Sequence, residues 1–201
     1  MGDTRVEILE AAVDILIESG YDALTTEAIA DRLEISHSGV HYHFETKDDL
    51  LIALIEEYLT DQLEAKVAFD GPPEKQLPKL LEFRIRGAKT IQQLEIPPPS
   101  IQLLAATGGS DDALRQALDT LFEAYVAELT ATIRDGVESG VFDTEAPERT
   151  AWTLAGLIEG AEVRASHDGS PAPFVWGIEA YVLPALYVDE SPTLNVEVDD
   201  G

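Results

Sequence analysis

The side chains best suited to hydrogen-bonding chemistry lie close together in the first quarter of the chain. His37, Ser38 and His41 are short or planar groups that can donate and accept hydrogen bonds at the edges of bases. Tyr42 and Lys47 follow them, and a phenol and an ammonium are suitable donors to phosphate oxygens. These residue types in this order favour contact with nucleic acid.

The histidines also allow metal binding. His37 and His41 are four residues apart on one helix face, and His43 is close by. Glu34 and His37 have the spacing of half a di-iron motif, but the sequence has no second Glu-x-x-His. We therefore predict no metal site and no cofactor. The sequence also lacks a glycine-rich phosphate loop, a nucleophile-elbow serine and a candidate triad, so we do not predict an enzyme.

Two helices are expected to frame this region. Apolar residues at helical spacing predict a helix over Thr4–Ser19, and Gly20 is a natural stop. The segment 46–49, Thr-Lys-Asp-Asp, has the form of a capping box and predicts a helix that reaches about Lys66.

Two shorter helices are expected between them. Thr25 or Thr26 can cap the first, and Ser36 can cap the second, which runs to about Phe44. Their connection, Glu34-Ile35, is very short. Two helices joined by such a turn form the arrangement that places the second helix in the major groove of DNA.

A longer string of residues accompanies these helices. It comprises Ile8-Leu9-Glu10-Ala11-Ala12, Gly20-Tyr21, Thr25-Thr26, Ile29-Ala30, Ile35-Ser36, Tyr42-His43-Phe44, and Lys47 before Leu50. In order and spacing the string resembles the TetR family of transcriptional regulators, and the resemblance covers about Arg5–Leu54 without a gap. It implies a helix-turn-helix head that reads DNA as a homodimer.

The resemblance also implies roles for individual residues. Thr25 or Thr26, Tyr42 and Lys47 would contact phosphates, whereas residues 36–41 would face base edges. The chemistry agrees, because a helix N-terminus presents free N–H groups to phosphate. The predicted DNA-binding residues are Thr25, Thr26, Ser36, His37, Ser38, Gly39, His41, Tyr42 and Lys47. The alternative to DNA contact is a purely structural role, in which the hydroxyl groups only cap helices and Tyr42 packs on the core of the head.

Two residues depart from the family pattern. Glu34 stands in the turn where glycine is usual, and His41 stands where an aromatic residue, commonly tyrosine, is usual. Glu34 must take a strained turn or a slightly different one, and a positive φ would cost about 1–3 kcal/mol. Both departures leave the target DNA sequence open.

The charge argues against DNA binding at first sight. The chain has 13 Lys and Arg against 39 Asp and Glu, a formal charge of -26. Residues 1–50 alone hold three basic and twelve acidic residues, a formal charge of -9. Such an acidic coat resembles proteins of extreme halophiles, where salt near 1 M shortens the Debye length to about 3 Å. We expect DNA specificity to rest mostly on neutral hydrogen bonds and apolar contacts.

The rest of the chain reads as helical. Proline and glycine clusters at 71–73, 96–100, 108–109, 140 and 168–171 divide it. The helices expected between these breaks are Glu74–Gln93, Ser100–Thr107, Asp111–Ser139, Pro147–His167 and Pro173–Tyr187. We predict an all-α protein of about nine helices, with a three-helix helix-turn-helix head on a larger helical body. The expected domains are a DNA-binding domain (1–48), an effector-binding and dimerisation domain (49–190), and an acidic tail (191–201) that is a candidate for disorder.

The body should hold a pocket for a small-molecule effector of unknown identity, since a repressor needs a ligand that distinguishes its DNA-bound and released states. Apolar and amphipathic residues on the middle helices are the candidates, and the alternative for each, which its residue type favours, is that it belongs to the core. They are Phe83, Gln92, Gln102, Leu103, Phe122, Tyr125 and Trp152.

Two apolar stripes near the C-terminal end indicate a dimer surface, because small residues let helices approach closely. The first stripe is Ala151, Leu154, Ala155, Ile158 and Ala161, and the second is Ile178, Tyr181, Val182, Ala185 and Leu186. The alternative is that both stripes are core of the single chain.

Zero cysteines exclude disulfides, and no long apolar run or leader stands out, so we expect a cytoplasmic protein without a membrane partner. The function predicted is a ligand-responsive repressor that binds a palindromic operator as a homodimer. The chief rival is a protein of the same fold that has lost DNA binding and acts as a protein-interaction or ligand-sensing module. A second rival, a metal-dependent enzyme in the helical body, lacks a ligand set.

Overall fold

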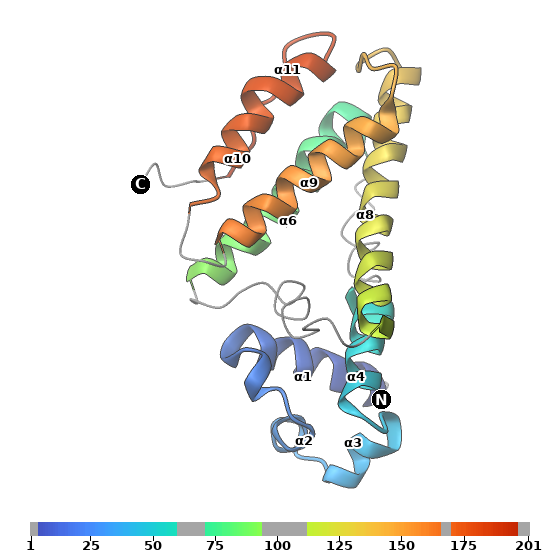
Figure 1. Cartoon of the computed structure of the whole chain (residues 1–201), viewed down its shortest axis with the longest axis vertical. Helices are drawn as coiled ribbons and strands as arrows, with labels where there is room; N and C mark the ends of the chain where they lie inside the picture. Colours follow the sequence, from blue (N-terminus) through green and yellow to red (C-terminus); the bar gives the residue numbers. More distant parts are fainter. Residues whose placement is uncertain (1–3, 60–70, 94–111, 166–169, 197–201) are drawn as a thin grey trace. The chain divides into compact units, whose positions relative to one another are not determined.

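The computed structural model describes residues 4–59, 71–93, 112–165 and 170–196 (Figure 1). Every regular element in these ranges is helical, so the prediction of an all-α protein is confirmed. The chain divides into two compact units. One comprises Met1–Ala65 and Ile96–Phe122, and the other comprises Lys66–Glu95 and Glu123–Gly201. We call them the head and the body.

The head begins with α1 (Thr4–Ser19), a single helical turn η1 (Tyr21–Ala23), α2 (Thr26–Leu33) and α3 (His37–His43). Then α4 (Lys47–Ala53) passes directly into a wider, π-helical turn, η2 (Leu54–Leu59). The part of the expected fourth helix beyond Leu59 lies outside the described residues.

Three predicted caps start three of these helices. The Thr25 hydroxyl accepts from the N–H of Ala28 at 3.1 Å, and the Ser36 hydroxyl caps α3 in the same way. Thr46 and Asp49 form a capping box, in which each side chain accepts from the other residue's backbone N–H at 3.0 Å. Such caps satisfy donors that a helix leaves free at its start, and each stabilises by about 0.5–2 kcal/mol.

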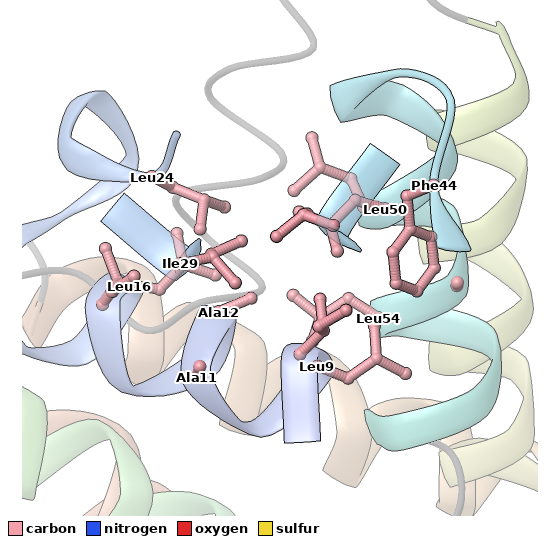
Figure 2. Close-up of a cluster of buried hydrophobic side chains, with 14 of the residues drawn as sticks. Leu9, Ala11, Ala12, Leu16, Leu24, Ile29, Phe44, Leu50 and Leu54 are labelled. Carbon is pink, nitrogen blue, oxygen red and sulfur yellow. The ribbon is translucent and has the colours of Figure 1, made fainter. Parts of the chain in front are cut away.

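The core of the head is a cluster of buried hydrophobic side chains, most of them aliphatic, with Phe44 among them (Figure 2). α1 supplies Leu9, Ala12 and Leu16, and they meet Ile29 of α2 and Leu50 of α4. Full burial of a leucine or isoleucine side chain stabilises by about 1.5–3 kcal/mol, so this cluster is what holds the short helices α2 and α3 in place. Leu114 and Ala117, from the first turns of the long helix α8, belong to the same cluster.

The body contains α6 (Pro73–Gln93), most of α8 (Asp112–Glu138) and α9 (Pro147–Ala165). A last helical stretch follows as α10 (Ala172–Gly177), a π-helical turn η3 (Ile178–Val182) and α11 (Leu183–Leu186). α9 packs along α6 and against α10, as Figure 1 shows. These elements match four of the five helices expected here, and the fifth, Ser100–Thr107, lies outside the described residues.

Close contacts join the end of α8 and the C-terminal residues to the rest of the body. Phe142 lies so close to Gly136 that a Cβ there would overlap its ring, so this position of α8 needs glycine. Phe142 also pairs with Tyr187 as an isolated antiparallel bridge. Part of the expected acidic tail docks on the body: Leu194 is buried, and its N–H donates to Glu179 at 2.7 Å. Residues 197–201 lie outside the described residues.

Candidate nucleic-acid interface and ligand-binding body

The turn between α2 and α3 has a left-handed residue at its centre. Glu34 has φ 55° and ψ 34°, and it is the only residue other than glycine with positive φ in the described part of the chain. The N–H of Ile35 donates to the carbonyl of Ala30 at 3.0 Å, which closes the end of α2. Of the two turns expected at Glu34, the chain therefore adopts the strained one, with positive φ.

The first turn of α3 presents a polar surface. The Ser36 hydroxyl caps α3 by accepting from the N–H of Gly39 at 3.1 Å, and it also lies 3.0 Å from the hydroxyl of Ser38. Both serines and His41 are exposed. These groups are therefore available to base edges without any rearrangement of the core.

His37 connects α3 to the start of α2. Its Nε2 lies 2.8 Å from the Thr26 hydroxyl and 3.3 Å from a carboxylate oxygen of Glu27. Its ring also meets that of His41 edge to face, at 4.5 Å between centroids. These contacts fix the imidazole, so His37 is a positioning group for α3 as well as a candidate for base contact.

Tyr42 and Lys47 differ in how they are held. The side chain of Tyr42 is 86% exposed, and its ring contacts that of His43 edge to face, at 5.2 Å between centroids. The ammonium of Lys47 lies 3.8 Å from the centroid of the Tyr21 ring and donates to the Tyr21 carbonyl at 3.3 Å. Partial burial lowers the pKa of Lys47, although neighbouring carboxylates oppose the shift. An ammonium has three donors, so Lys47 can still reach a phosphate while its stem is held.

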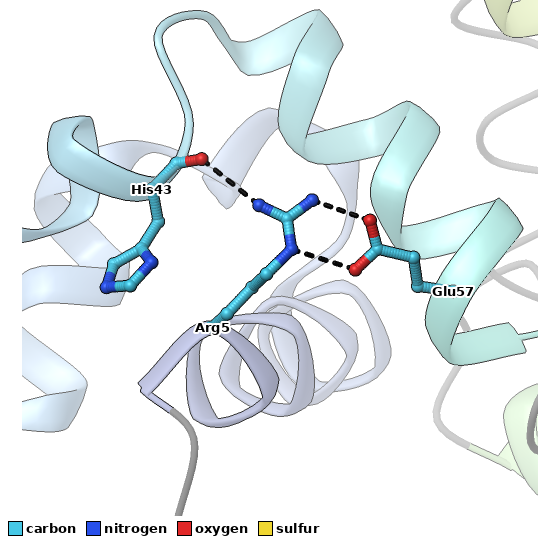
Figure 3. A network of polar contacts seen from close by, with 3 residues as sticks. All are labelled: Arg5, His43 and Glu57. Atoms are coloured by element: carbon cyan, nitrogen blue, oxygen red, sulfur yellow. Dashed lines mark hydrogen bonds and ion pairs between the residues drawn. The ribbon is translucent and has the colours of Figure 1, made fainter.

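The two arginines among residues 4–59 of the head are tied to carboxylates. Arg5 donates to both oxygens of Glu57 at 2.8 and 2.6 Å and to the carbonyl of His43 at 3.2 Å (Figure 3). Arg32 makes the same two-pronged contact with Glu18 at 2.8 and 2.6 Å, and this contact lowers the pKa of Glu18. Arg5 and Arg32 thus join helices of the head to one another, a role that their place in the sequence did not indicate.

All nine predicted DNA-binding residues lie between the end of η1 and the start of α4, and none is buried. Thr25, Ser36, His37, Ser38, His41 and Tyr42 are exposed, and Thr26, Gly39 and Lys47 are half-buried. The structure brings them together, and their contact with DNA stays a prediction. Among the described residues no group of three or more histidine and carboxylate side chains could hold a metal ion.

A polar group of three side chains lies inside the body. Arg84 of α6 donates through Nε and Nη2 to the two oxygens of Glu162 of α9, both at 2.6 Å. The guanidinium carbon lies 4.7 Å from the ring centroid of Tyr125 of α8. The Tyr125 hydroxyl is buried without any hydrogen-bond partner. Burial raises the pKa of Tyr125. Burial alone would lower the pKa of Arg84, but the Glu162 carboxylate beside it raises this pKa overall.

Tyr125 is among the pocket residues predicted from the sequence, whereas its two neighbours in this group are not. The sequence contains a sign that these two residues are buried. Arg84 falls on the apolar stripe of Leu77 and Leu80, and Glu162 follows the stripe that ends at Ala161. A charged residue inside an apolar stripe is expected to be buried and paired.

The other predicted pocket residues are dispersed. Phe83 and Phe122 are half-buried, and Trp152 is 51% exposed. Gln102 and Leu103, and the side chain of Gln92, lie outside the described residues. Their place in a pocket stays a prediction.

The predicted dimer residues fall into two groups. Ala151, Leu154, Ala155, Ile158, Ala161, Ile178 and Leu186 are buried within the single chain. The reason is that the stripe of α9 packs on the body's own helices, chiefly α6. Tyr181 is 79% exposed, Ala185 is exposed and Val182 is half-buried, so only these three are available on the surface. Trp152, Val163, Trp176 and Val188 are further exposed apolar residues on or beside the same helices.

A helix-turn-helix head followed by a larger helical body defines a class of DNA-binding regulators. Residues 8–54 match the family model of bacterial regulatory proteins of the tetR family, and residues 103–174 match that of the BetI-type transcriptional repressor C-terminal region. A TetR transcription regulator from Haloarcula marismortui is 30% identical, with 92% of this chain and 95% of that chain covered and a TM-score of 0.68. The chain belongs to the TetR family of transcriptional regulators.

Two solved structures with bound molecules share the fold. A putative transcriptional regulator from Saccharomonospora viridis in complex with choline is 20% identical, with a TM-score of 0.68 and coverage of 92% of this chain and 98% of that chain. The regulator FadR from Bacillus subtilis in complex with stearoyl-CoA is 19% identical, with a TM-score of 0.59 and coverage of 81% and 85%. Among the helices that the structure describes, none has the length and apolar character needed to cross a membrane.

Proposed function

We propose that this protein is a ligand-responsive transcriptional repressor that binds a palindromic operator as a homodimer. In this proposal residues 1–48 read DNA, residues 49–190 bind the effector and dimerise, and the protein acts in the cytoplasm. The acidic composition supports a cell interior of high salt, as in extreme halophiles.

The observation that carries the proposal is the α2–turn–α3 unit. Three capped helices on one core hold α3 with its first turn exposed, and the polar groups of that turn face outward. Tyr42, 86% exposed at the end of α3, has an accessible phenol for a phosphate.

The homodimer is supported by the exposed apolar residues at the C-terminal end of the body. Trp176 is 46% exposed and Tyr181 is 79% exposed, and both belong to the last helical stretch. Aromatic residues of this kind are enriched at protein interfaces. We assign the dimer surface to this outer face and no longer to the buried stripes. A twofold dimer would present two α3 helices to half-sites about 34–36 Å apart.

Ligand response is supported by family membership and by the bound molecules of the two relatives, choline and stearoyl-CoA. The effector would bind in the body and favour a state in which the two heads no longer fit the operator. α4 is one route for this change. α8 is a second, because this single helix supplies Leu114 and Ala117 to the core of the head and Tyr125 to the body.

The alternative is an interaction or ligand-sensing module without DNA binding. One observation favours it: Arg5 and Arg32 are both held by carboxylates, in a head that carries twelve acidic residues up to Leu50. DNA binding would then depend on the neutral donors of α3 and on Lys47.

The test is binding of the purified protein to DNA from its own upstream region and to a genome-wide fragment library, at about 0.5–3 M KCl. We expect a specific site with two half-sites in a footprint. Tyr42→Ala and Lys47→Ala should each weaken specific binding by about ten-fold or more.

Two matched variants separate the causes. Tyr42→Phe isolates the phenol oxygen, and Lys75→Ala removes the same type of charge from an exposed position on α6 in the body. Lys75→Ala should bind DNA as the unaltered protein does. If no specific fragment is recovered at any salt concentration, the interaction-module function replaces the repressor.

A further inference from the structure

One arginine joins three elements of the head. Arg5 lies at the start of α1, and its guanidinium donates through Nε and Nη2 to the two oxygens of Glu57 in η2, at 2.8 and 2.6 Å (Figure 3). Its Nη1 donates at 3.2 Å to the carbonyl of His43, the last residue of α3. The guanidinium carbon also lies 4.4 Å from the centroid of the Phe44 ring. These contacts fix the end of α3 relative to both α1 and η2.

The carbonyl that Arg5 holds belongs to a helix end. The last four carbonyls of a helix lack a partner within that helix, and α3 has only seven residues. A cation at this end also complements the negative end of the helix dipole. The start of α3 is held separately, by the Ser36 cap and by the contact of His37 with α2. Arg5 therefore acts at the opposite end, beside the exposed Tyr42.

The geometry of the contact between Arg5 and Glu57 matters more than its strength. The two side chains are 34% and 49% exposed, and ion pairs so exposed contribute little to stability. A two-pronged contact between a guanidinium and a carboxylate nevertheless sets the relative orientation of the two planar groups. Loss of this contact should therefore move the end of α3 while the head stays folded on its buried core.

Glu57 connects this arrangement to the segment that leads into the body. η2 follows α4 directly, and the chain passes from the head into the body at Lys66. A π-helical turn is hydrogen-bonded from residue i to i+5, and such turns are rare and frequent at functional sites. A rearrangement of η2 would move the carboxylate that holds Arg5, and with it the guanidinium that holds the His43 carbonyl.

We propose that Arg5 is a positioning residue for DNA recognition, and that it makes the placement of the last turn of α3 depend on the conformation of η2. Glu57 orients the guanidinium of Arg5, and the guanidinium holds the His43 carbonyl and so places Tyr42 for its phosphate. This inference rests on the proposed repressor function and adds a route by which a change in the body reaches α3.

Arg5→Lys tests the geometry without changing the charge. Lysine keeps the positive charge, but its ammonium lacks the planar fork that contacts both carboxylate oxygens. Binding to the selected operator should weaken about five- to ten-fold. Arg32→Lys is the matched control, because Arg32 makes the same two-pronged contact with Glu18 but joins α2 to α1. It should stay within about two-fold of the unaltered protein, and an equal loss in both variants would overturn the proposal.

Glu57→Gln separates placement from charge by the sign of its effect. An amide has one acceptor oxygen, so it cannot accept from both Nε and Nη2 of Arg5. The same change removes a negative charge from the head, which by itself should strengthen binding to DNA. We expect operator binding about three- to ten-fold weaker, whereas Glu18→Gln, with the same change of charge, should bind as tightly as the unaltered protein or more tightly. Tighter binding by Glu57→Gln would overturn the proposal.

Amide hydrogen exchange in the full-length, DNA-free protein gives a readout that a general loss of stability would not reproduce. The Phe44 N–H donates to the Val40 carbonyl at 3.0 Å at the end of α3, and the Ile29 N–H donates to the Thr25 carbonyl at 3.1 Å in α2. Arg5→Lys should speed exchange about ten-fold at Phe44 and less than about two-fold at Ile29. Equal acceleration at both amides, or none at Phe44, would overturn the proposal.

The exchange measurement needs no DNA, so the failure of each proposal can be recognised. If exchange is selective but no DNA fragment is selected, the repressor function fails and the placement of α3 by Arg5 stands. If an operator is selected and both Arg5→Lys and Glu57→Gln bind it as the unaltered protein does, the repressor function stands and the role of Arg5 in recognition is overturned.

Discussion

Glu34 lies in a backbone conformation that the fold accommodates but that lowers the stability of the protein. Its φ of 55° lies in the left-handed region, where a side chain with a Cβ costs about 1–2 kcal/mol relative to glycine. The hydrogen bond from the Ile35 N–H to the Ala30 carbonyl holds the turn nevertheless. Glu34→Gly should therefore raise Tm by several degrees, about 2–4 °C per kcal/mol for a chain of this length.

The matched variant is Glu34→Ala, which removes the same carboxylate and keeps the Cβ. It should gain much less than glycine. Equal gains would assign the effect to the removal of a negative charge from the acidic head, and backbone strain would not be its cause.

At the scale of the elements, sequence patterns predict where a helix starts better than they predict which surface the helix packs against. The Thr-Lys-Asp-Asp segment at 46–49 correctly predicts a capping box, because the chemistry is local. The apolar stripe from Ala151 to Ala161 correctly predicts a buried face, but periodicity does not say whether the burying surface belongs to the same chain. Here α6 of the same chain covers it.

The contact between α6 and α9 could not be predicted for the same reason. Arg84 and Glu162 are 78 residues apart in sequence, and only the fold brings them together. The head was more predictable, since its caps and its short turn between α2 and α3 act over a few residues.

The α6–α9 pair should depend strongly on its buried ion pair. Glu162 is 5% exposed at its side chain and Arg84 is 19% exposed, so removing one charge leaves the other poorly solvated. Glu162→Gln should lower the free energy of unfolding by about 3–5 kcal/mol in urea denaturation. The exposed pair of Arg134 and Glu148, with side chains 56% and 71% exposed, is the control.

Glu148→Gln should change stability by no more than about 1 kcal/mol, because exposed ion pairs contribute little. A small effect of Glu162→Gln would mean that the guanidinium reaches solvent or another acceptor when the Glu162 carboxylate is removed. The α6–α9 packing would then rest on aliphatic contacts alone.

At the scale of the whole molecule, the formal charge of -26 leaves few basic side chains to neutralise phosphates, and the number of phosphates neutralised sets how the proposed binding to DNA depends on salt. A protein that neutralises six phosphates per dimer loses affinity with roughly the fifth power of salt concentration. In this head Arg5 and Arg32 are occupied by carboxylates, and Lys47 alone of the three basic residues up to Leu50 has no ion-pair partner among the described residues. Few counterions would be released when such a surface meets DNA.

The affinity for the selected operator should therefore fall with less than about the second power of KCl concentration between about 0.5 and 3 M. The measurement is a series of fluorescence-anisotropy titrations, with Lys47→Ala beside the unaltered protein. Because Lys47 is the predicted phosphate contact that carries a full charge, its removal should flatten the remaining slope by about one unit for each phosphate that it neutralises. A slope near the fifth power would mean the opposite: the arginines would have to leave Glu57 and Glu18 for phosphates, and specificity would rest on charge.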